Sequence, residues 1–328
     1  MNNYFKKYIG HELQLRGVEE ARLVGGKADG MRVLNVRNGQ GLAFTISLDR
    51  CADISRVVFK GDNMGYFAPC GYVSPQYYDG IGDGFLKSFT AGFLTTCGLT
   101  AVGTPCVDDG EALPLHGTIS NTPCESYGYW TEDDAIHIKT TVRDAALFAH
   151  KLLLEREYIC LLDSNTIYLT DTITNIGSAE CPLEVLYHCN MGYPLLSENA
   201  VVTIPSSAVT PRNAHASNGL EDCLKMEVPQ RGYEEKCYYH TLCGKPCVSI
   251  FNSDIGKGVS ISYDTDELKY FTEWKMMGEY EYVLGLEPGN CLPDGRDVMR
   301  AKGMLEFLKP DETKVHHIKF EFMEEAQC

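Results

Sequence analysis

The stretch LAFTISL, residues 42–48, decides the fold class of this chain. Its apolar residues Leu42, Phe44, Ile46 and Leu48 alternate with smaller or polar ones, the two-residue period of a strand with one buried face. The same alternation recurs in IHIKTTV, VSISY and HIKFEF (residues 136–142, 259–263 and 317–322). The pattern therefore predicts an all-β protein of many short antiparallel strands.

Just upstream, NVRNGQG (residues 35–41) places Asn38-Gly39 between two strand-like runs. Both residues tolerate positive φ, so the dipeptide predicts a β-hairpin. Helical periodicity is sparse. We expect short helices only in HELQLRGVEEARLV (residues 11–24) and VMRAKGMLEFL (residues 298–308).

The chain has no Pro/Ser-rich linker, charge block or internal repeat that would divide it. Residues 1–328 are long enough for a large core, and β-sandwiches of this size occur as one unit. We therefore expect a single domain, one large antiparallel β-sandwich.

Composition excludes several classes of partner. The formal net charge of −16 argues against nucleic acid and anionic membranes, since phosphate binding needs clustered Lys and Arg. The N-terminal residues contain no apolar run suited to a signal peptide or membrane span. The 14 cysteines are interpreted as reduced thiols, because disulfide frameworks belong to short secreted chains. These features predict a cytoplasmic protein.

The common cofactor motifs are missing. GIGDG (residues 80–84) has the wrong spacing for a dinucleotide-binding loop and follows no buried strand,. CGKPC (residues 243–247) lacks the second cysteine pair of a zinc site,. No phosphate-binding loop, zinc-protease helix or serine-hydrolase elbow occurs in the sequence,. We expect neither a metal nor an organic cofactor.

Polar residues at the ends of apolar runs are the remaining candidates for chemistry. His188 and Asn190 lie in YHCNMGYPLL (residues 187–196), where a strand-like run meets a turn. His188 is either a hydrogen-bonded core histidine or one half of an acid/base pair. Glu287 ends the apolar run YVLGLE, so burial should raise its pKa toward that of a useful base. His116 lies in LHGTISNTP.

Further candidates carry an equally strong structural alternative. Arg50 and Asp53, in LDRCADI (residues 48–54), form either part of a site or a structural ion pair. Trp274 and Lys275 follow one another in EWKMMGEYEYVLGLEPGN, where the tryptophan either packs in the core or offers its face to a sugar. Spacing alone does not decide whether these residues converge.

Several ordered blocks of the chain resemble the galactose mutarotase-like superfamily, and within it the aldose 1-epimerase-related DUF4432 family. The resemblance covers nearly the whole chain. Its blocks are LDRCADI, GFLTTCGLTAVG, LHGTISNTP, LFAHKLLLER, YHCNMGYPLL, EWKMMGEYEYVLGLEPGN and Gly295-Arg296. It implies a large antiparallel β-supersandwich with a sugar site in an open cleft.

The resemblance also implies roles for individual residues. His188 matches the general acid of aldose 1-epimerases, Glu287 the general base, and His116 a second histidine that binds substrate near the ring oxygen. Substrate-binding positions in or near the cleft are expected at Arg50, Asp53, Asn190, Lys275 and Asn290. The sequence HGTIS lacks the arginine of the hexose-6-phosphate branch, and the aspartate with which galactose mutarotases hold a hydroxyl has no clear counterpart.

These expectations predict a mutarotase that interconverts the anomers of a free aldose, acting as a monomer or homodimer on a small sugar. Three alternatives stay open. A glycoside hydrolase would need Glu287 paired with Asp53 or Glu273 at a defined separation, which leaves the histidines without a role. A non-catalytic sugar-binding protein could share the fold. An isomerase could act on the ring-opened sugar with the same pair.

Overall fold

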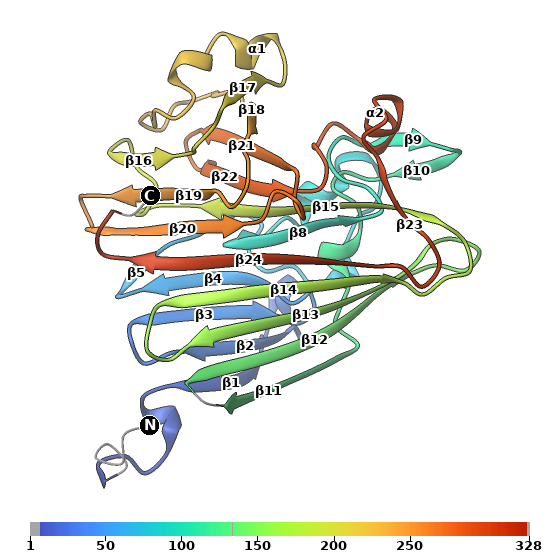
Figure 1. The fold of residues 1–328 in the computed structure, drawn as a ribbon. Coiled ribbons are helices and arrows are strands. Elements are labelled where there is room, and N and C mark those ends of the chain that lie inside the picture. Colours follow the sequence, from blue (N-terminus) through green and yellow to red (C-terminus); the bar gives the residue numbers. More distant parts are fainter. Residues whose placement is uncertain (1–6, 133, 327–328) are drawn as a thin grey trace.

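The computed structural model describes residues 7–132 and 134–326. These residues form mainly antiparallel strands, so the all-β prediction is confirmed (Figure 1). The strands are β1 (Gly17–Arg22), β2 (Arg32–Arg37), β3 (Leu42–Ser47), β4 (Asp53–Phe59), β5 (Asp62–Asn63), β6 (Tyr66–Phe67), β7 (Ala91–Gly92), β8 (Leu94–Leu99), β9 (Cys106–Asp108), β10 (Glu111–Leu113), β11 (Ser126–Glu132), β12 (Ala135–Ala145), β13 (Lys151–Leu161), β14 (Thr166–Asn175), β15 (Cys181–Met191), β16 (Ala200–Thr203), β17 (Ala208–Pro211), β18 (Lys236–Thr241), β19 (Cys247–Asn252), β20 (Lys257–Tyr263), β21 (Tyr270–Met277), β22 (Tyr282–Gly289), β23 (Glu306–Leu308) and β24 (Thr313–Met323).

The helices are short. They are α1 (Ala214–Ser217), α2 (Arg296–Ala301) and the 3₁₀ turns η2 (Glu12–Gln14), η3 (Gly26–Ala28), η4 (Pro75–Tyr77), η5 (Gly82–Lys87), η6 (Ile119–Asn121) and η7 (Leu220–Asp222). The helix predicted over residues 11–24 is wrong beyond η2, because its second half pairs with β2 as strand β1. The helix predicted over residues 298–308 ends early at Gly303, whose φ is 68°, and its last residues form β23.

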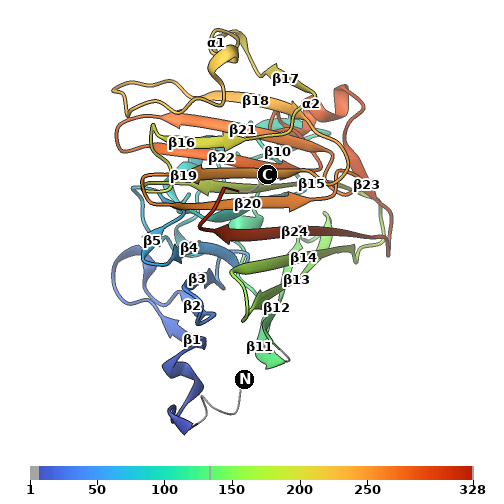
Figure 2. The same cartoon turned by 60° about the vertical axis from the view of Figure 1, so that its left-hand side comes forward.

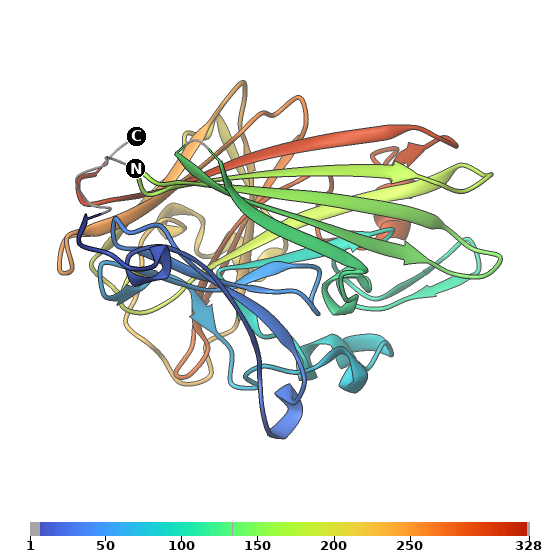
Figure 3. The ribbon, with the colours of Figure 1, turned by 90° about the horizontal axis from the view of Figure 1, so that it is seen from below.

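Three sheets supply most of the structure. Their strand orders are β1-β2-β3-β4-β5, then β11-β12-β13-β14-β24-β20-β19-β16, and β17-β18-β21-β22-β15-β23 with β8 also paired to β15. Figure 3 shows the blue N-terminal strands lying beneath the long green and red strands. Apolar side chains from these sheets meet in one core cluster, in which the rings of Phe59 and Phe322 lie 6.0 Å apart. The two-residue alternation is thus explained by one buried face per strand.

The predicted hairpin at Asn38-Gly39 joins β2 to β3. Only Gly39 of the two adopts positive φ, at 81°. Asn38 is buried and uses its side chain instead, because its Oδ1 accepts hydrogen bonds from the backbone N–H groups of Gln40 and Leu42. The asparagine therefore fixes the loop by satisfying donors that the strands leave unpaired.

Strands β18, β21, β22 and β15 lie next to one another in the third sheet (Figure 2), and β8 also pairs with β15. They carry His188, Glu287 and Trp274 within a few residues of one another across the sheet. This sheet is where the sequence blocks quoted above for residues 187–196 and 282–290 come together.

Twelve cysteines among the described residues are free thiols, whereas Cys247 is disulfide-bonded. The expectation of reduced thiols throughout is therefore wrong at Cys247. In the part of the chain that the structure describes, no helix has the length and apolar character that crossing a membrane requires, and no group of three or more His, Cys, Asp or Glu side chains is arranged to hold a metal ion.

Candidate active site

Strand register brings His188 and Glu287 face to face. β15 and β22 pair antiparallel with Leu186 opposite Gly289, and the same register sets His188 opposite Glu287. His188 Nε2 and Glu287 Oε1 lie 3.2 Å apart. On the other side of β22, Thr272 is the register partner of Glu287. A row of three polar side chains therefore crosses three adjacent strands on one face of the sheet.

A glycine leaves the space that the Glu287 carboxyl occupies. A Cβ at Gly285 would lie 2.1 Å from Glu287 Oε1 and 3.0 Å from the Cβ of Trp274. Real Cβ atoms do not approach that closely, so any side chain here would displace the carboxyl. The glycine in YVLGLE thus has a specific function in the local packing.

His116 reaches the same place from a loop that follows β10. Its backbone has a φ of 57°, a left-handed conformation that is uncommon for a residue with a side chain. Its ring centroid lies 5.7 Å from that of His188. The backbone N–H of Gly103 donates to His116 Nδ1 at 3.3 Å. Nδ1 is therefore the acceptor, and in the neutral ring the proton is on Nε2.

The three residues line one cavity of about 360 Å³. Such a volume suits a monosaccharide-sized ligand. The cavity is walled by Asp83, Phe85, Leu86, Phe89, Gly103, Thr104, Pro105, Leu115, His116, His188, Arg212, Glu235, Cys237, Thr272, Trp274, Glu287 and Pro293. The structure thus brings together His188, Glu287 and His116, which the sequence places 72 and 99 residues apart.

Burial shifts the protonation of all three groups toward the neutral form. It raises the pKa of the Glu287 carboxyl well above its usual range, with the charge of Glu235 acting in the same direction and Arg212 against it. It lowers the pKa of His188 well below the usual value, and the nearby His116 ring lowers it further. Burial and then Arg212 lower the pKa of His116 to about 4. The raised carboxyl pKa agrees with the prediction made from YVLGLE.

Aromatic side chains pack against both histidines. Phe89 and Trp274 both meet the His188 ring edge-on, with centroids 5.3 and 5.2 Å away. Phe85 lies 5.3 Å from the His116 ring. Because these rings exclude water from the histidines, the imidazoles are held neutral and their hydrogen bonds act in a medium of low polarity.

Three buried polar atoms at the cavity have no hydrogen-bond partner among the described residues. They are His188 Nδ1, Glu287 Oε1 and Thr272 Oγ1. Although Glu287 Oε1 is close to His188, its geometry is not that of a hydrogen bond. Buried polar atoms without partners are rare in proteins. Their gathering in one row indicates a cavity shaped for a polar ligand.

The sequence did not predict Arg212 and Glu235 as site residues. Arg212 Nη2 donates to Thr104 Oγ1 at 2.8 Å and to the Pro293 carbonyl at 3.0 Å. Glu235 Oε2 accepts from Trp274 Nε1 at 2.6 Å. Both residues belong to polar surroundings that resemble any surface loop, so no local pattern could have distinguished them.

Four of the residues expected to bind substrate lie outside the cavity lining. Each is buried and satisfies backbone groups instead. Arg50 donates to the Val73 carbonyl, Asn190 to the His188 carbonyl, and Lys275 to the Asp222 carbonyl. Asn290 Oδ1 accepts from the Val185 N–H and its Nδ2 donates to the Leu183 carbonyl. The strand-end asparagines and the lysine therefore hold the strands and loops around the site.

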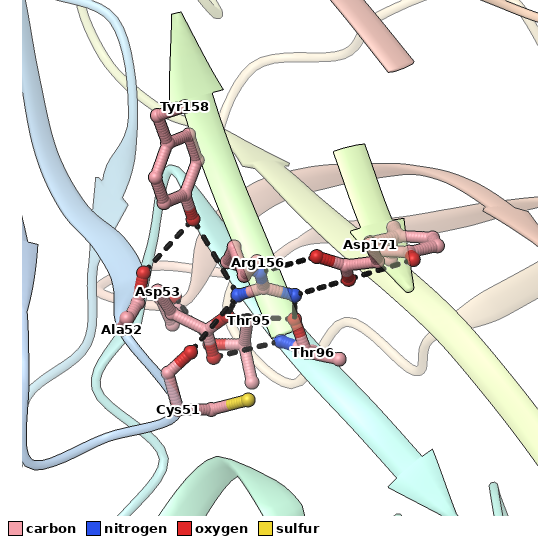
Figure 4. A network of polar contacts seen from close by, with 10 residues as sticks. Cys51, Ala52, Asp53, Thr95, Thr96, Arg156, Tyr158 and Asp171 are labelled. Carbon is pink, nitrogen blue, oxygen red and sulfur yellow. Dashed lines mark hydrogen bonds and ion pairs between the residues drawn. The ribbon is translucent and has the colours of Figure 1, made fainter. Parts of the chain in front are cut away.

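Asp53 also lies outside the cavity lining. Its Oδ1 pairs with Arg156 Nη1 at 2.7 Å, and its Oδ2 accepts from the Thr96 N–H at 2.8 Å. Figure 4 shows the Arg156 guanidinium between Asp53 and Asp171, which it contacts at 2.7 Å through Nη2. Asp53 therefore does form a structural ion pair. Its partner is Arg156, whereas the sequence suggested Arg50.

The carboxylates considered as hydrolase partners of Glu287 are engaged elsewhere. Asp53 is held by Arg156, and Glu273 Oε2 lies 3.0 Å from His240 Nε2 in a fully buried pair. Neither lines the cavity. The two carboxyl pairs that the sequence offered for glycoside hydrolysis are therefore not formed.

Comparison with known proteins shows what this chain is similar to. The model of the "Domain of unknown function (DUF4432)" matches residues 28–322. A candidate aldose 1-epimerase from Klebsiella pneumoniae subsp. pneumoniae superposes with a TM-score of 0.89 at 25% identity, over 96% of this chain and 86% of that one. No curated protein matches the sequence.

More distant solved structures share the fold. A galactose mutarotase-like protein from Clostridium acetobutylicum gives a TM-score of 0.70 at 15% identity, covering 94% of this chain and 99% of that one. The galactose 1-epimerase from Lactobacillus acidophilus gives 0.62 at 12% identity, covering 95% and 100%. The galactose mutarotase-like fold predicted from the sequence is confirmed.

Proposed function

This chain belongs to the DUF4432 family, whose model matches residues 28–322, and we propose that it is an aldose 1-epimerase, a mutarotase that interconverts the anomers of a free sugar. The observation that carries the proposal is the contact of 3.2 Å between His188 Nε2 and Glu287 Oε1 at the wall of a monosaccharide-sized cavity. An acid and a base within hydrogen-bond reach of one substrate are what this reaction needs.

The reaction moves one proton at each of two sugar oxygens. Glu287 takes the proton from the C1 hydroxyl while His188 gives a proton to the ring oxygen, and the C1–O5 bond breaks to leave the aldehyde. Rotation about C1–C2 presents the other face of the carbonyl. His188 then takes its proton back as O5 attacks C1, and Glu287 returns the other proton to the new C1 hydroxyl. The pair ends as it began, with no net gain or loss of protons.

The protonation of the pair suits this cycle. Burial favours a protonated Glu287 and a neutral His188, so the two side chains together hold one proton and no net charge. With that proton on the imidazole instead, the pair consists of the carboxylate and the imidazolium that the first step uses. Sugar hydroxyls that donate to the carboxylate stabilise its charged form.

His116 supplies a neutral donor. Because the Gly103 N–H donates to Nδ1, the proton on Nε2 is free for a substrate oxygen. A pKa of about 4 keeps the ring uncharged near neutral pH. His116 thereby polarises the sugar oxygen without competing with His188 as the acid.

The remaining wall fits the chemistry of a sugar. Trp274, Phe85 and Phe89 offer apolar surface for C–H groups, while Thr272, Glu235 and Arg212 offer hydrogen bonds for hydroxyls. This division between apolar walls and a few polar groups is typical of small-molecule sites.

Anomer exchange measured by NMR saturation transfer tests the proposal. Freshly dissolved aldoses, pentoses, hexoses and uronates, would be compared with wild type, His188→Ala and Glu287→Ala. We expect acceleration of exchange for at least one sugar, lost in both variants. Absence of acceleration for every sugar, with binding intact, would favour a sugar-binding protein or an isomerase of the open-chain sugar.

A further inference from the structure

A second buried glutamate lies on the strand that carries His188. Glu184 is in β15, four residues before His188, and its side chain is fully buried. Its Oε2 accepts a hydrogen bond of 2.9 Å from the backbone N–H of Val102. Its Oε1 has no hydrogen-bond partner among the described residues. The mechanism above gives this carboxyl no task, and it does not line the cavity.

Val102 belongs to a loop, residues 100–104, that runs from the end of β8 to the cavity. The next residue, Gly103, donates its N–H to His116 Nδ1 at 3.3 Å and accepts from the His116 N–H at 3.0 Å. Glu184 therefore anchors this loop at Val102, and the next residue, Gly103, orients the ring of His116.

The rest of the loop is fixed from other sides. Arg296 Nη1 donates to the Thr100 carbonyl at 3.2 Å. A Cβ at Gly103, whose φ is 82°, would lie 2.1 Å from the carbonyl carbon of Pro293. Gly103 is thus held tightly against Pro293. Arg296 belongs to the Gly295-Arg296 block, to which no role could be assigned from the sequence. These contacts restrict the position of the Gly103 backbone relative to His116.

From these contacts we propose that Glu184 is a positioning residue, which acts through Val102 and Gly103 to hold His116 in the tautomer with its proton on Nε2. The inference rests on the proposed function only for its effect on catalysis. Without the Glu184 acceptor, the Val102 N–H is buried unpaired, and the loop relaxes to satisfy it. The Gly103 N–H then moves away from Nδ1, and His116 no longer presents a fixed Nε2–H to the sugar.

Three substitutions separate this role from simple loss of stability. Glu184→Gln keeps an oxygen acceptor for Val102, and burial raises the pKa of Glu184 to about 8, so a neutral amide mimics the mostly protonated carboxyl at pH 7. Glu184→Leu keeps the volume without an acceptor. Glu184→Asp keeps the carboxyl but withdraws it by one methylene. Glu273→Leu is the matched control, since Glu273 is equally buried but bonded to His240.

The tautomer of His116 is measured on protein without sugar, from long-range ¹H–¹⁵N spectra of the ¹⁵N-histidine-labelled chain, assigned with His116→Asn. We expect one neutral tautomer with the proton on Nε2 in wild type, Glu184→Gln and Glu273→Leu. In Glu184→Leu and Glu184→Asp we expect a mixture or the opposite tautomer. Anomer exchange by Glu184→Leu and Glu184→Asp should fall about tenfold or more in kcat, with a smaller change in KM.

Two results would overturn the positioning role. One is a wild-type tautomer in folded Glu184→Leu or Glu184→Asp. The other is an altered tautomer in Glu184→Gln, which also decides the matter if the other two variants do not fold. A wild-type protein without mutarotase activity would contradict the proposed function alone, because the tautomer is read without a substrate.

Discussion

His188 Nε2 and Glu287 Oε1 lie 3.2 Å apart because β15 and β22 pair in a register that sets the two residues opposite one another. Shifting either strand by one residue would turn one of the two side chains to the other face of the sheet. The acid/base geometry is therefore fixed by a central, doubly paired part of the sheet, which is a rigid support for a catalytic pair.

Gly285 should be required for activity. An added methyl would lie 2.1 Å from Glu287 Oε1, so Gly285→Ala should push the carboxyl out of line with His188. We expect kcat to fall at least about tenfold, since small misplacements of reacting groups cost that much or more. Gly128→Ala is the control, because a Cβ there meets nothing within 4 Å. Equal activity of both alanine variants would contradict the packing described for Glu287.

Asp53 should matter for stability more than for catalysis. Asp53→Asn leaves the fully buried guanidinium of Arg156 with one of its two charged partners. Breaking a buried pair in this way costs about 3–5 kcal/mol of unfolding free energy. Urea titrations would measure the loss. Glu279→Gln, which breaks a largely exposed pair with Arg231, should cost no more than about 1 kcal/mol.

The activity of Asp53→Asn separates its two possible roles. Measured per folded molecule, anomer exchange should stay within about threefold of wild type, because Asp53 does not line the cavity. A loss of more than a hundredfold in a folded variant would restore Asp53 to the site.

The stability of the chain should depend on pH through His116. Its pKa is about 4 in the folded state against about 6.5 in an unfolded chain. Between these values the unfolded chain binds the additional proton, so the contribution of His116 is complete above pH 6.5 and is lost as the pH falls toward 4. Asparagine tolerates the left-handed backbone at this position, which makes His116→Asn a suitable variant.

The measurement is the difference in unfolding free energy between wild type and His116→Asn. From pH 7 to pH 4 the unfolding free energy of wild type should fall by about 1–3 kcal/mol more than that of His116→Asn. A difference that does not change with pH would show that water reaches the ring freely and that its pKa is ordinary.

Sugar binding should be visible in the fluorescence of one tryptophan. The chain has two tryptophans, and Trp274 lines the cavity whereas Trp130 stacks on His137 at the surface of β11. In Trp130→Phe the emission therefore reports Trp274 alone. We expect a saturable change in Trp274 emission when a sugar that is also a substrate is added. The same change should be retained in the double variant Trp130→Phe/Glu287→Gln. A protein that catalyses exchange without any such change would contradict stacking or contact at Trp274.

The fold could be predicted from the sequence because each strand buries one face. Period-two runs such as residues 42–48 and 317–322 form strands β3 and β24 as expected. The sequence predicts a short helix over residues 11–24, which includes residues 17–22. Residues 17–22 instead form an edge strand whose side chains are at most partly buried, so the strand is set by pairing with β2.

The site could be predicted only in part. His188, Glu287 and His116 are polar residues in apolar or glycine-rich surroundings, and the family resemblance gave them their roles. Arg50 and Asp53 lie in similar sequence surroundings, but Arg50 donates to a buried backbone carbonyl and Asp53 pairs with the buried Arg156. Arg212 and Glu235 reach the cavity from loops 24 and 47 residues beyond His188, and such proximity is decided by tertiary packing.

A double-mutant cycle on anomer exchange tests the acid/base pair most directly. The rate would be measured for wild type, His188→Gln, Glu287→Gln and the double variant, each shown to be folded and to bind sugar. We predict a loss of roughly 10²–10⁴-fold in each single variant and no further loss in the double variant, because residues that act as a unit are not additive. Losses that multiply in the double variant, or single variants as active as wild type, would contradict a pair that works through its shared proton.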